Sequence, residues 1–252
     1  MYLTIQGLVL RVTDYNDRDA LLTVLSREQG KLTVKARGLR RKNSPLTACC
    51  QLLSFSEFTL FEYRGMFTIR EGRPIELFAA LRRDLAKLSL ATYFAQVSAL
   101  LAQEDLPNPE LQSLVLNCLY ALCSLPLPEQ QIKAVFEIRA MCLAGYSPEL
   151  SGCCVCGKEY PDRIDLAAGT LCCGNCHTEG KGIRMPLSPA ALDAMRYCAL
   201  CSPKRLFSFQ LNPSDLSLLA DASEGYLMTQ LSQGFSTLDF YKSLSMADPS
   251  AI

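Results

Sequence analysis

Two closely spaced cysteine pairs set the strongest limit on how this chain can fold. Cys153 and Cys156 form one Cys-x2-Cys pair, and Cys173 and Cys176 form a second pair, with sixteen residues between the two pairs. This spacing is typical of structural zinc modules. In such modules each short turn presents two thiolates to one tetrahedral ion, and the intervening loop brings the second turn opposite the first. The sequence therefore predicts one structural zinc ion bound by these four cysteines.

Neighbouring residues leave the choice of ligands open. Cys154 adjoins Cys153, Cys172 adjoins Cys173, and His177 is a further candidate. We prefer the set above because its two Cys-x2-Cys spacings match, and the alternative without a metal is a group of reduced structural thiols. A catalytic zinc keeps an open position and usually recruits histidine or carboxylate. Because the chain has one histidine, a closed structural site is expected.

Glycines accompany both cysteine pairs. Gly157 follows the first pair, and Gly174 lies inside the second. Since glycine tolerates positive φ in tight turns, we expect both residues to support the turns that present the sulfurs.

The remaining cysteines indicate a reducing compartment. The chain has 252 residues and 13 cysteines, an odd number that fits reduced thiols and a metal site better than a disulfide framework. Cys198 and Cys201 form a third Cys-x2-Cys pair, but the helical pattern around them predicts buried thiols. There is no apolar run long enough to span a membrane and no signal-peptide pattern at the N-terminus, so we predict a cytoplasmic protein.

The first third of the chain has a β pattern. Short runs with alternating or continuous apolar residues are separated by turns such as the one ending at Gly30 and the one at Arg64-Gly65. The predicted strands are 5–12, 20–25, 31–36, 55–63 and 66–69. Five short strands are most economically closed into a small oligonucleotide-binding (OB) type barrel, because closure leaves no exposed strand edge. An SH3-like barrel is the alternative.

Basic residues gather on and just after the third predicted strand. Residues 1–80 contain twelve Lys and Arg against eight Asp and Glu, a net charge of +4 within a chain of net charge zero. A cationic strand face with nearby aromatic rings is typical of single-strand-binding barrels, whereas a merely solvated face is the alternative. The predicted DNA-binding residues are Lys31, Lys35, Arg37, Arg40, Arg41 and Lys42. Candidate stacking rings are Phe58, Phe61, Tyr63 and Phe67, although most of these are expected in the core.

Beyond residue 76 the apolar period becomes helical. Spacings of three and four predict helices over residues 77–103, 111–125, 129–145, 188–201, from 212 onward and 225–244. We expect the helices before and after the cysteine segment to pack on each other. The predicted fold class is therefore α+β, with a barrel domain (1–75), a helical domain (76–150 and 180–246) and an inserted zinc module (151–179).

Motifs of nucleotide and hydrolytic enzymes are missing. The sequence has neither the G-x4-G-K-[ST] phosphate loop nor a G-x-G-x2-G dinucleotide fingerprint. Its one histidine adjoins the zinc cysteines, so no Ser-His-Asp or Cys-His arrangement can be assembled elsewhere. Since no carboxylate constellation suggests metal-dependent phosphoryl chemistry either, we predict a protein that is not an enzyme.

Three stretches together resemble a known family. They are GLVLRVTDYNDRDALLTVLSREQGKLTVKARGLRRKNS in the barrel, FEIRAMCLAGYSPELSGCCVCG at the end of the third predicted helix, and GTLCCGNCH at the second cysteine pair. The order and content of these stretches resemble the RecO family of bacterial recombination mediators and DNA repair proteins. The resemblance runs over residues 7–244.

The resemblance implies a non-enzymatic role on DNA. RecO proteins bind single- and double-stranded DNA, anneal complementary strands, and act with RecR to load the RecA recombinase onto strands coated by single-stranded DNA-binding protein (SSB). They also bind the acidic SSB tail, for which Arg139 is the candidate contact here. Some members lack the cysteines, so the zinc would be architectural, and a cytoplasmic, nucleoid-associated protein is implied. The alternative is a zinc-stabilised protein-interaction scaffold that does not bind DNA.

Overall fold

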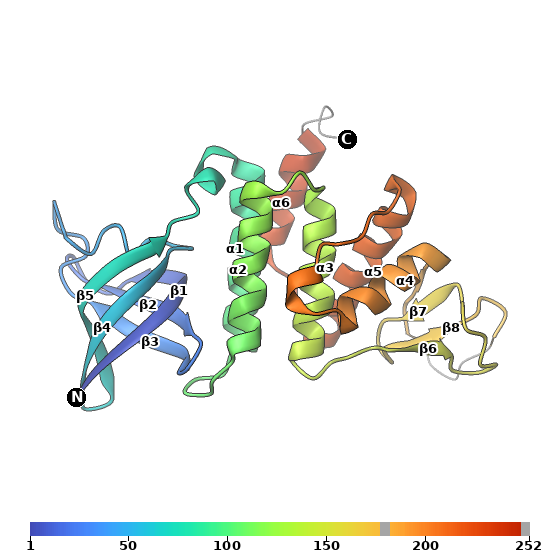
Figure 1. Cartoon of the computed structure of the whole chain (residues 1–252), viewed down its shortest axis with the longest axis horizontal. Coiled ribbons are helices and arrows are strands. Elements are labelled where there is room, and N and C mark those ends of the chain that lie inside the picture. Colours follow the sequence, from blue (N-terminus) through green and yellow to red (C-terminus); the bar gives the residue numbers. More distant parts are fainter. Residues whose placement is uncertain (177–181, 248–252) are drawn as a thin grey trace. The chain divides into compact units, whose positions relative to one another are not determined.

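The chain divides into two compact units, each described here by itself. The computed structural model describes residues 1–176 and 182–247, with side chains up to residue 244. The first unit comprises Met1–Leu125 and the segment from Phe235 onward, and the second unit comprises Pro126–Gly234. Figure 1 labels the elements of both units.

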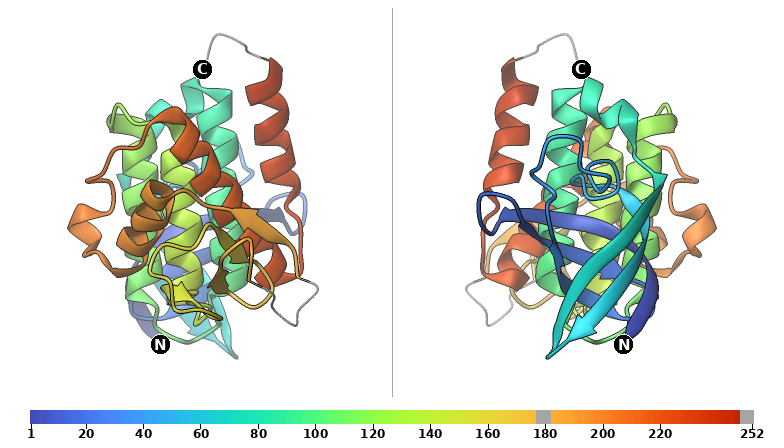
Figure 2. Two further views of the ribbon diagram at one scale, coloured as in Figure 1. Left: turned by 90° about the vertical axis from the view of Figure 1, so that its right-hand side faces the viewer. Right: turned by 90° about the vertical axis from the view of Figure 1, so that its left-hand side faces the viewer.

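The first unit begins with a closed five-stranded barrel. Its strands are β1 (Tyr2–Asp14), β2 (Ala20–Ser26), β3 (Gly30–Ala36), β4 (Phe55–Tyr63) and β5 (Met66–Glu76). They close in the order β1-β2-β3-β5-β4, with β3 and β5 parallel and the other pairs antiparallel. The right-hand view of Figure 2 shows the barrel from its own side. The OB-type barrel predicted from the five apolar runs is confirmed, and closure leaves no free edge.

The period of two along each strand builds the barrel core. In β3 the side chains of Leu32, Val34 and Ala36 are buried, whereas Thr33 is exposed and Lys35 is half-buried. The inner side chains of the other strands complete this core, and they include Phe58, which is fully buried. Because Phe58 lies inside, it is not a stacking ring for a ligand, as expected for most of the aromatic candidates.

Three α-helices and a short 3-10 helix complete the first unit. They are η1 (Ala79–Arg83), α1 (Leu85–Leu101), α2 (Pro109–Ser124) and α6 (Ser236–Ala247). The sequence predicted one helix over residues 77–103, but the chain is extended at Asp84, whose side chain accepts a hydrogen bond from the Lys87 N–H and caps α1. Phe235, directly before α6, packs edge-on against Tyr93 of α1, with the ring centroids 5.4 Å apart.

Hydrogen bonds and a close backbone approach connect the barrel to these helices. The buried Gln112 of α2 donates to the carbonyls of Gln6 and Leu25 at 3.1 and 2.8 Å. At the β2–β3 turn Gly30 has φ +65, and a Cβ there would lie 2.0 Å from the carbonyl oxygen of Leu106. Only glycine fits this approach, so the turn residue recognised in the sequence also sets the docking of the barrel.

The second unit combines helices with a small sheet. The helices are α3 (Glu129–Leu143), α4 (Pro189–Leu200), η2 (Pro203–Arg205) and α5 (Pro213–Leu231), and α3 packs against both α4 and α5. The sheet has the order β6-β8-β7-β9. Its strands are β6 (Glu149–Cys153), β7 (Arg163–Asp165), β8 (Thr170–Cys172) and β9 (Arg184–Pro186). The sequence analysis missed this sheet, because strands of three residues are too short for a period to emerge.

The prediction of a last helix over residues 225–244 was wrong. Helix α5 continues through Gly225 and ends at Ser232, which has φ 51, and α6 starts afresh at Ser236. At Gly225 this helix packs closely against its neighbours, since a Cβ there would lie 2.8 Å from the Met185 sulfur and 2.9 Å from a Leu166 methyl. Packing, rather than a helix start, explains this glycine.

The predicted fold class is confirmed, since a barrel precedes a helical region that carries the four-cysteine segment. The domain limits 1–75, 76–150 with 180–246, and 151–179 stay predictions. Along the chain, the boundary between the two compact units falls between α2 and α3, and α6 belongs to the first unit. In the part of the chain that the structure describes, no helix is long and apolar enough to cross a membrane.

Candidate metal centre and nucleic-acid interface

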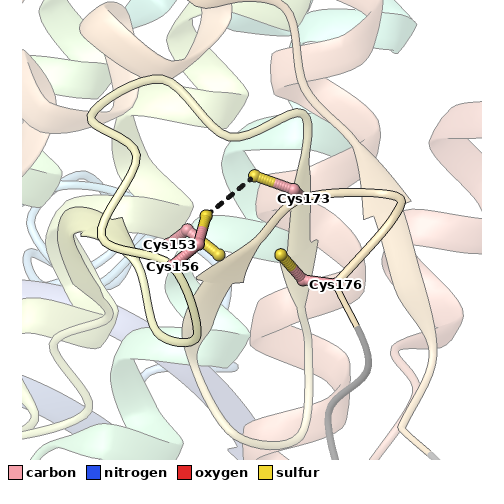
Figure 3. Close-up of side chains that lie close together, drawn as sticks. All are labelled: Cys153, Cys156, Cys173 and Cys176. Atoms are coloured by element: carbon pink, nitrogen blue, oxygen red, sulfur yellow. Dashed lines mark hydrogen bonds between the residues drawn. The ribbon is translucent and has the colours of Figure 1, made fainter.

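The first cysteine pair lies on a tight turn at the end of β6. The Cys153 N–H donates to the Lys158 carbonyl at 2.8 Å, and the Gly157 N–H donates back to the Cys153 carbonyl at 2.9 Å. Gly157 has φ +72, as its position in the sequence predicted. The turn directs Cys153 and Cys156 towards the second pair (Figure 3).

The second pair lies on a similar turn directly after β8. The Cys176 N–H donates to the Cys173 carbonyl at 3.0 Å. Gly174 does not have the positive φ that we expected. A Cβ there would make a tight contact, 3.1 Å from the Asp162 carboxylate, which accepts a hydrogen bond from the Gly174 N–H.

The two turns bring four sulfur atoms together. The Sγ atoms of Cys153, Cys156, Cys173 and Cys176 all lie within 4.8 Å of one another (Figure 3). The Sγ atoms of Cys156 and Cys173 are 3.7 Å apart. A tetrahedral zinc ion with Zn–S bonds of about 2.3 Å places its sulfurs about 3.8 Å apart. This group could therefore hold a metal ion, and its all-thiolate donor set fits zinc.

The neighbouring candidates lie outside this group. Cys154 is exposed, and Cys172 is buried as the last residue of β8. Adjacent residues of an extended chain point to opposite faces, so Cys172 and Cys173 present their sulfurs to different sides. Burial raises the pKa of the Cys172 thiol, which suits a core residue. His177 lies outside the described residues.

Backbone N–H groups surround the sulfur of Cys153. Hydrogen bonds from the N–H groups of Cys156, Val155 and Cys173 lower the pKa of the Cys153 thiol to about 6. In contrast, the pKa of Cys173 is raised to about 12, first by burial and then by the neighbouring sulfurs. Four thiols this close repel as thiolates, so a divalent cation is the natural counterpart of the group.

Helix α4 anchors the cysteine segment through one side chain. The guanidinium of Arg196 donates to the carbonyls of Leu150, Ser151 and Glu159 at 2.9, 3.3 and 2.7 Å. Its plane also lies 5.0 Å from the centre of the Tyr160 ring. Sequence reasoning missed Arg196, because no local pattern links this helix residue to a turn almost forty positions earlier.

Half of the predicted DNA-binding residues have internal partners. The Lys31 ammonium donates to the Ala99 carbonyl at 3.1 Å. The Lys35 ammonium lies 3.1 Å from the Asp19 carboxylate, and Arg40 lies 2.8 Å from Asp14. These contacts do not remove the positive charge, but part of it is balanced by the protein itself.

The other three predicted residues, Arg37, Arg41 and Lys42, are exposed. Among the described residues they form no salt bridge, so their charge is free to meet a phosphate. Sequence reasoning missed Tyr15 and Arg18 in the β1–β2 loop. Both are exposed, the Tyr15 ring lies 4.5 Å from the Lys35 ammonium, and the Arg18 carbonyl accepts the Arg40 N–H at 3.1 Å. The two loops therefore form one cationic surface.

Arg139 in α3 is engaged with a neighbouring helix. Its guanidinium donates to the carbonyls of Cys198 and Ala199 at the C-terminal end of α4. A cation at this position stabilises the negative end of the helix dipole. Arg139 thus has a structural role. Among the described residues, its hydrogen bonds go to none of the other predicted site residues.

Comparison with known proteins identifies the family of this chain. The Recombination protein O N terminal family matches residues 1–78, and the Recombination protein O C terminal family matches residues 82–239. The DNA repair protein RecO of Acetivibrio thermocellus is 34% identical over 246 residues, which cover 96% of this chain and 97% of the relative. That of Bacillus pumilus is 31% identical over 84% of this chain and 83% of the relative.

The fold and the cysteine cluster define a class of protein in which an OB-type barrel precedes a helical region with a four-cysteine group that could hold a metal ion. Matches to both family regions cover nearly the whole chain. The chain belongs to the RecO family, as the three sequence stretches indicated.

Proposed function

We propose that this chain is a non-enzymatic recombination mediator in DNA repair. It would bind single- and double-stranded DNA, anneal complementary strands, and act with RecR to load RecA onto SSB-coated single strands. Family membership supports the role, and the observation that carries it is the cationic surface of Arg37, Arg41 and Lys42 on an OB-type barrel.

Annealing by this surface requires charge and no bond chemistry. Cations along the β3 loop neutralise phosphates on two strands at once and lower their mutual repulsion, so that base pairing proceeds. Releasing the counterions of the DNA makes such binding strongly salt-dependent. Cys153, Cys156, Cys173 and Cys176 would hold a structural zinc ion, which would cross-link two turns of the second unit and take no part in this step.

The acidic SSB tail is proposed to bind near Arg139. Helix α4 ends beside a surface hollow of about 550 Å³, which is lined by Tyr197, Leu200 and Arg205 among others. Cationic and apolar groups together suit a peptide that carries carboxylates and apolar side chains. Acting on DNA with RecR and SSB, the protein would work in the bacterial cytoplasm at the nucleoid.

The test is the binding of labelled single- and double-stranded oligonucleotides at two salt concentrations. The variant is Arg37→Glu/Arg41→Glu/Lys42→Glu, because these cations form no salt bridge with any residue that the structure describes. The control is Lys158→Glu/Lys204→Glu/Arg205→Glu, which changes net charge equally in the second unit. We expect tight, salt-sensitive binding that only the first variant loses.

Absence of binding at low salt by the wild-type chain would support the other candidate. In that case the barrel serves a zinc-stabilised scaffold for protein interaction, and the cationic surface is simply solvated. Equal losses in both triple variants would show that net charge, rather than this surface, attracts the DNA.

A further inference from the structure

The register of the barrel places four side chains of its outer face in one row, of which Tyr2 is exposed, Lys35 and Phe61 are half-buried and Thr68 is buried. Lys35 of β3 is opposite Thr68 of β5, Thr68 is opposite Phe61 of β4, and Phe61 is opposite Tyr2 of β1. Their sequence neighbours Val34, Ile69 and Leu60 point into the core. The row therefore crosses the outer face of the barrel and begins at the cationic surface described above.

Aromatic rings occupy the far end of this row. The rings of Tyr2 and Phe61 lie 5.2 Å apart at a tilt of 53°. Tyr63, two residues after Phe61, shares its outward face at the β4–β5 hairpin. Tyr2 and Tyr63 are 65% and 61% exposed. The two rings are therefore accessible to a ligand.

Each group of rings has its own cation. The Arg70 guanidinium lies 4.8 Å from the centre of the Phe61 ring, and that of Arg64 lies 5.2 Å from the centre of the Tyr63 ring. At the other end the Lys35 ammonium lies 4.5 Å from the Tyr15 ring. The rings of Tyr15, Phe61 and Tyr63 thus each have a cation 4.5–5.2 Å from the ring centre.

We propose that Tyr2, Phe61, Tyr63 and Arg70 form a base-stacking platform for single-stranded DNA, continuous with the cationic surface on β3. Rings offer faces to unpaired bases, and the arginines balance the phosphates that flank them. Bases in a duplex are already stacked and paired, so the platform distinguishes single strands from double strands. This inference rests on the proposed function, to which it adds a preferred DNA structure.

A protein partner fits this face less well. Neighbouring strands are about 4.8 Å apart, so a row over four strands forms a narrow track of rings with cations beside them, rather than a broad apolar patch. An extended single strand of nucleic acid likewise presents bases with phosphates beside them. Binding of a protein instead of DNA is an outcome that the experiment below separates.

The experiment uses the full chain with Phe61→Leu/Tyr63→Ala, and Tyr120→Ala as the control. Leucine keeps an apolar side chain beside Tyr2, whereas Tyr120 is an exposed ring of α2 outside this row. Affinity is measured for an oligo-dT single strand and for a duplex of equal length. A single strand carrying 2-aminopurine reports stacking directly, through quenching of its fluorescence.

We expect the double variant to bind the single strand at least about tenfold more weakly, as loss of base stacking predicts. Duplex binding should change less than twofold, 2-aminopurine quenching should fall, and the control should behave as wild type. Unchanged single-strand affinity and quenching, with Arg37→Glu/Arg41→Glu/Lys42→Glu still defective, overturns the platform and leaves the proposed function standing. A wild-type chain that binds neither DNA overturns both. Equal losses for single strand and duplex overturn the platform alone.

Discussion

The Sγ atoms of Cys156 and Cys173 lie 3.7 Å apart, although the two residues belong to turns at opposite ends of a sixteen-residue loop. This distance is close to the edge of a zinc–thiolate tetrahedron, about 3.8 Å. The ion would join the end of β6 to the end of β8, so removing it should loosen the second unit selectively.

Chelation of the metal should therefore lower the thermal stability of the second unit while the barrel stays folded, because a structural metal contributes directly to folding. Hydrogen exchange followed by mass spectrometry checks this. We expect faster exchange in β6, β8 and α4 and unchanged protection in β2 and β3. One zinc per chain before chelation is the control, and unaltered exchange in the second unit would contradict the proposal.

Replacing the neighbouring cysteines should leave the metal in place. Cys154→Ser and Cys172→Ala should each keep one zinc per chain, because neither sulfur belongs to the group of four. The matched variant Cys156→Ser should lose most of its zinc. Metal content measured by mass spectrometry decides between the sets. Loss of zinc in the Cys154 variant would exchange it for Cys153 as a ligand.

Sequence spacing predicted the metal centre and the barrel for physical reasons. Two turns with two sulfurs each need only local geometry, which the Cys-x2-Cys spacing encodes. The strand from Phe55 alternates over nine residues, and its start was predicted to the residue, whereas the start of β2 at Ala20 was predicted from a continuous apolar run. By contrast, β7 and β9 have three residues each, and only their pairing within the sheet, β7 with β8 and β9 with β7, makes them strands.

Contacts between distant residues could not be predicted in this way. The sequence grouped Lys31, Lys35 and Arg40 with the free cations, but Ala99, Asp19 and Asp14 meet them in the folded chain. The same limit hid the row from Lys35 to Tyr2, since it depends on the register of four strands. A period identifies which face a side chain takes, whereas the neighbours on that face follow from strand order.

A buried ion cluster should be essential to the second unit. The Lys133 ammonium lies 3.1 Å from Glu137 and 2.9 Å from Glu224, and the Glu137 side chain is fully buried. Lys133→Met should lower the free energy of unfolding by about 3–5 kcal/mol, because it removes the ammonium that lies beside the buried Glu137 carboxylate. Urea denaturation measures this. Lys133→Met/Glu137→Gln should recover part of the loss, and a single variant as stable as wild type would contradict the prediction.

The pKa of Lys133 sets the pH range of this effect. Burial acts to lower the pKa, but the carboxylates of Glu137 and Glu224 outweigh it, so the pKa is raised. A raised lysine pKa contributes stability that is fully present below its unfolded value of about 10.4 and is lost only as pH rises through the folded pKa. Titration of Lys133 should therefore leave the stability of the wild-type chain unchanged between pH 6 and pH 8.

Two variants of Arg139 can separate its structural role from its proposed role in binding the SSB tail. Arg139→Ala removes a charged donor from the carbonyls of Cys198 and Ala199, and it should lower the free energy of unfolding by about 1–2 kcal/mol. Arg139→Lys should keep part of this stability. If Arg139 also contacts the acidic tail, both variants should bind an SSB-tail peptide more weakly in calorimetry. Peptide affinity that is unchanged in a folded Arg139→Ala would exclude the contact.

Asp19 should make the loops of the barrel sensitive to acid. The Gly38 N–H donates to its carboxylate at 2.8 Å and Lys35 lies 3.1 Å away, and these contacts lower the pKa of Asp19 to about 2. A lowered carboxyl pKa contributes stability above the unfolded value, near 3.9, that is lost as pH falls towards 2. Asp19→Asn keeps an acceptor for Gly38 but removes the charge, so it should melt below wild type at pH 6. This difference should shrink steadily between pH 4 and pH 2 in thermal denaturation, and a difference independent of pH would show that the charge of Asp19 does not stabilise the loops.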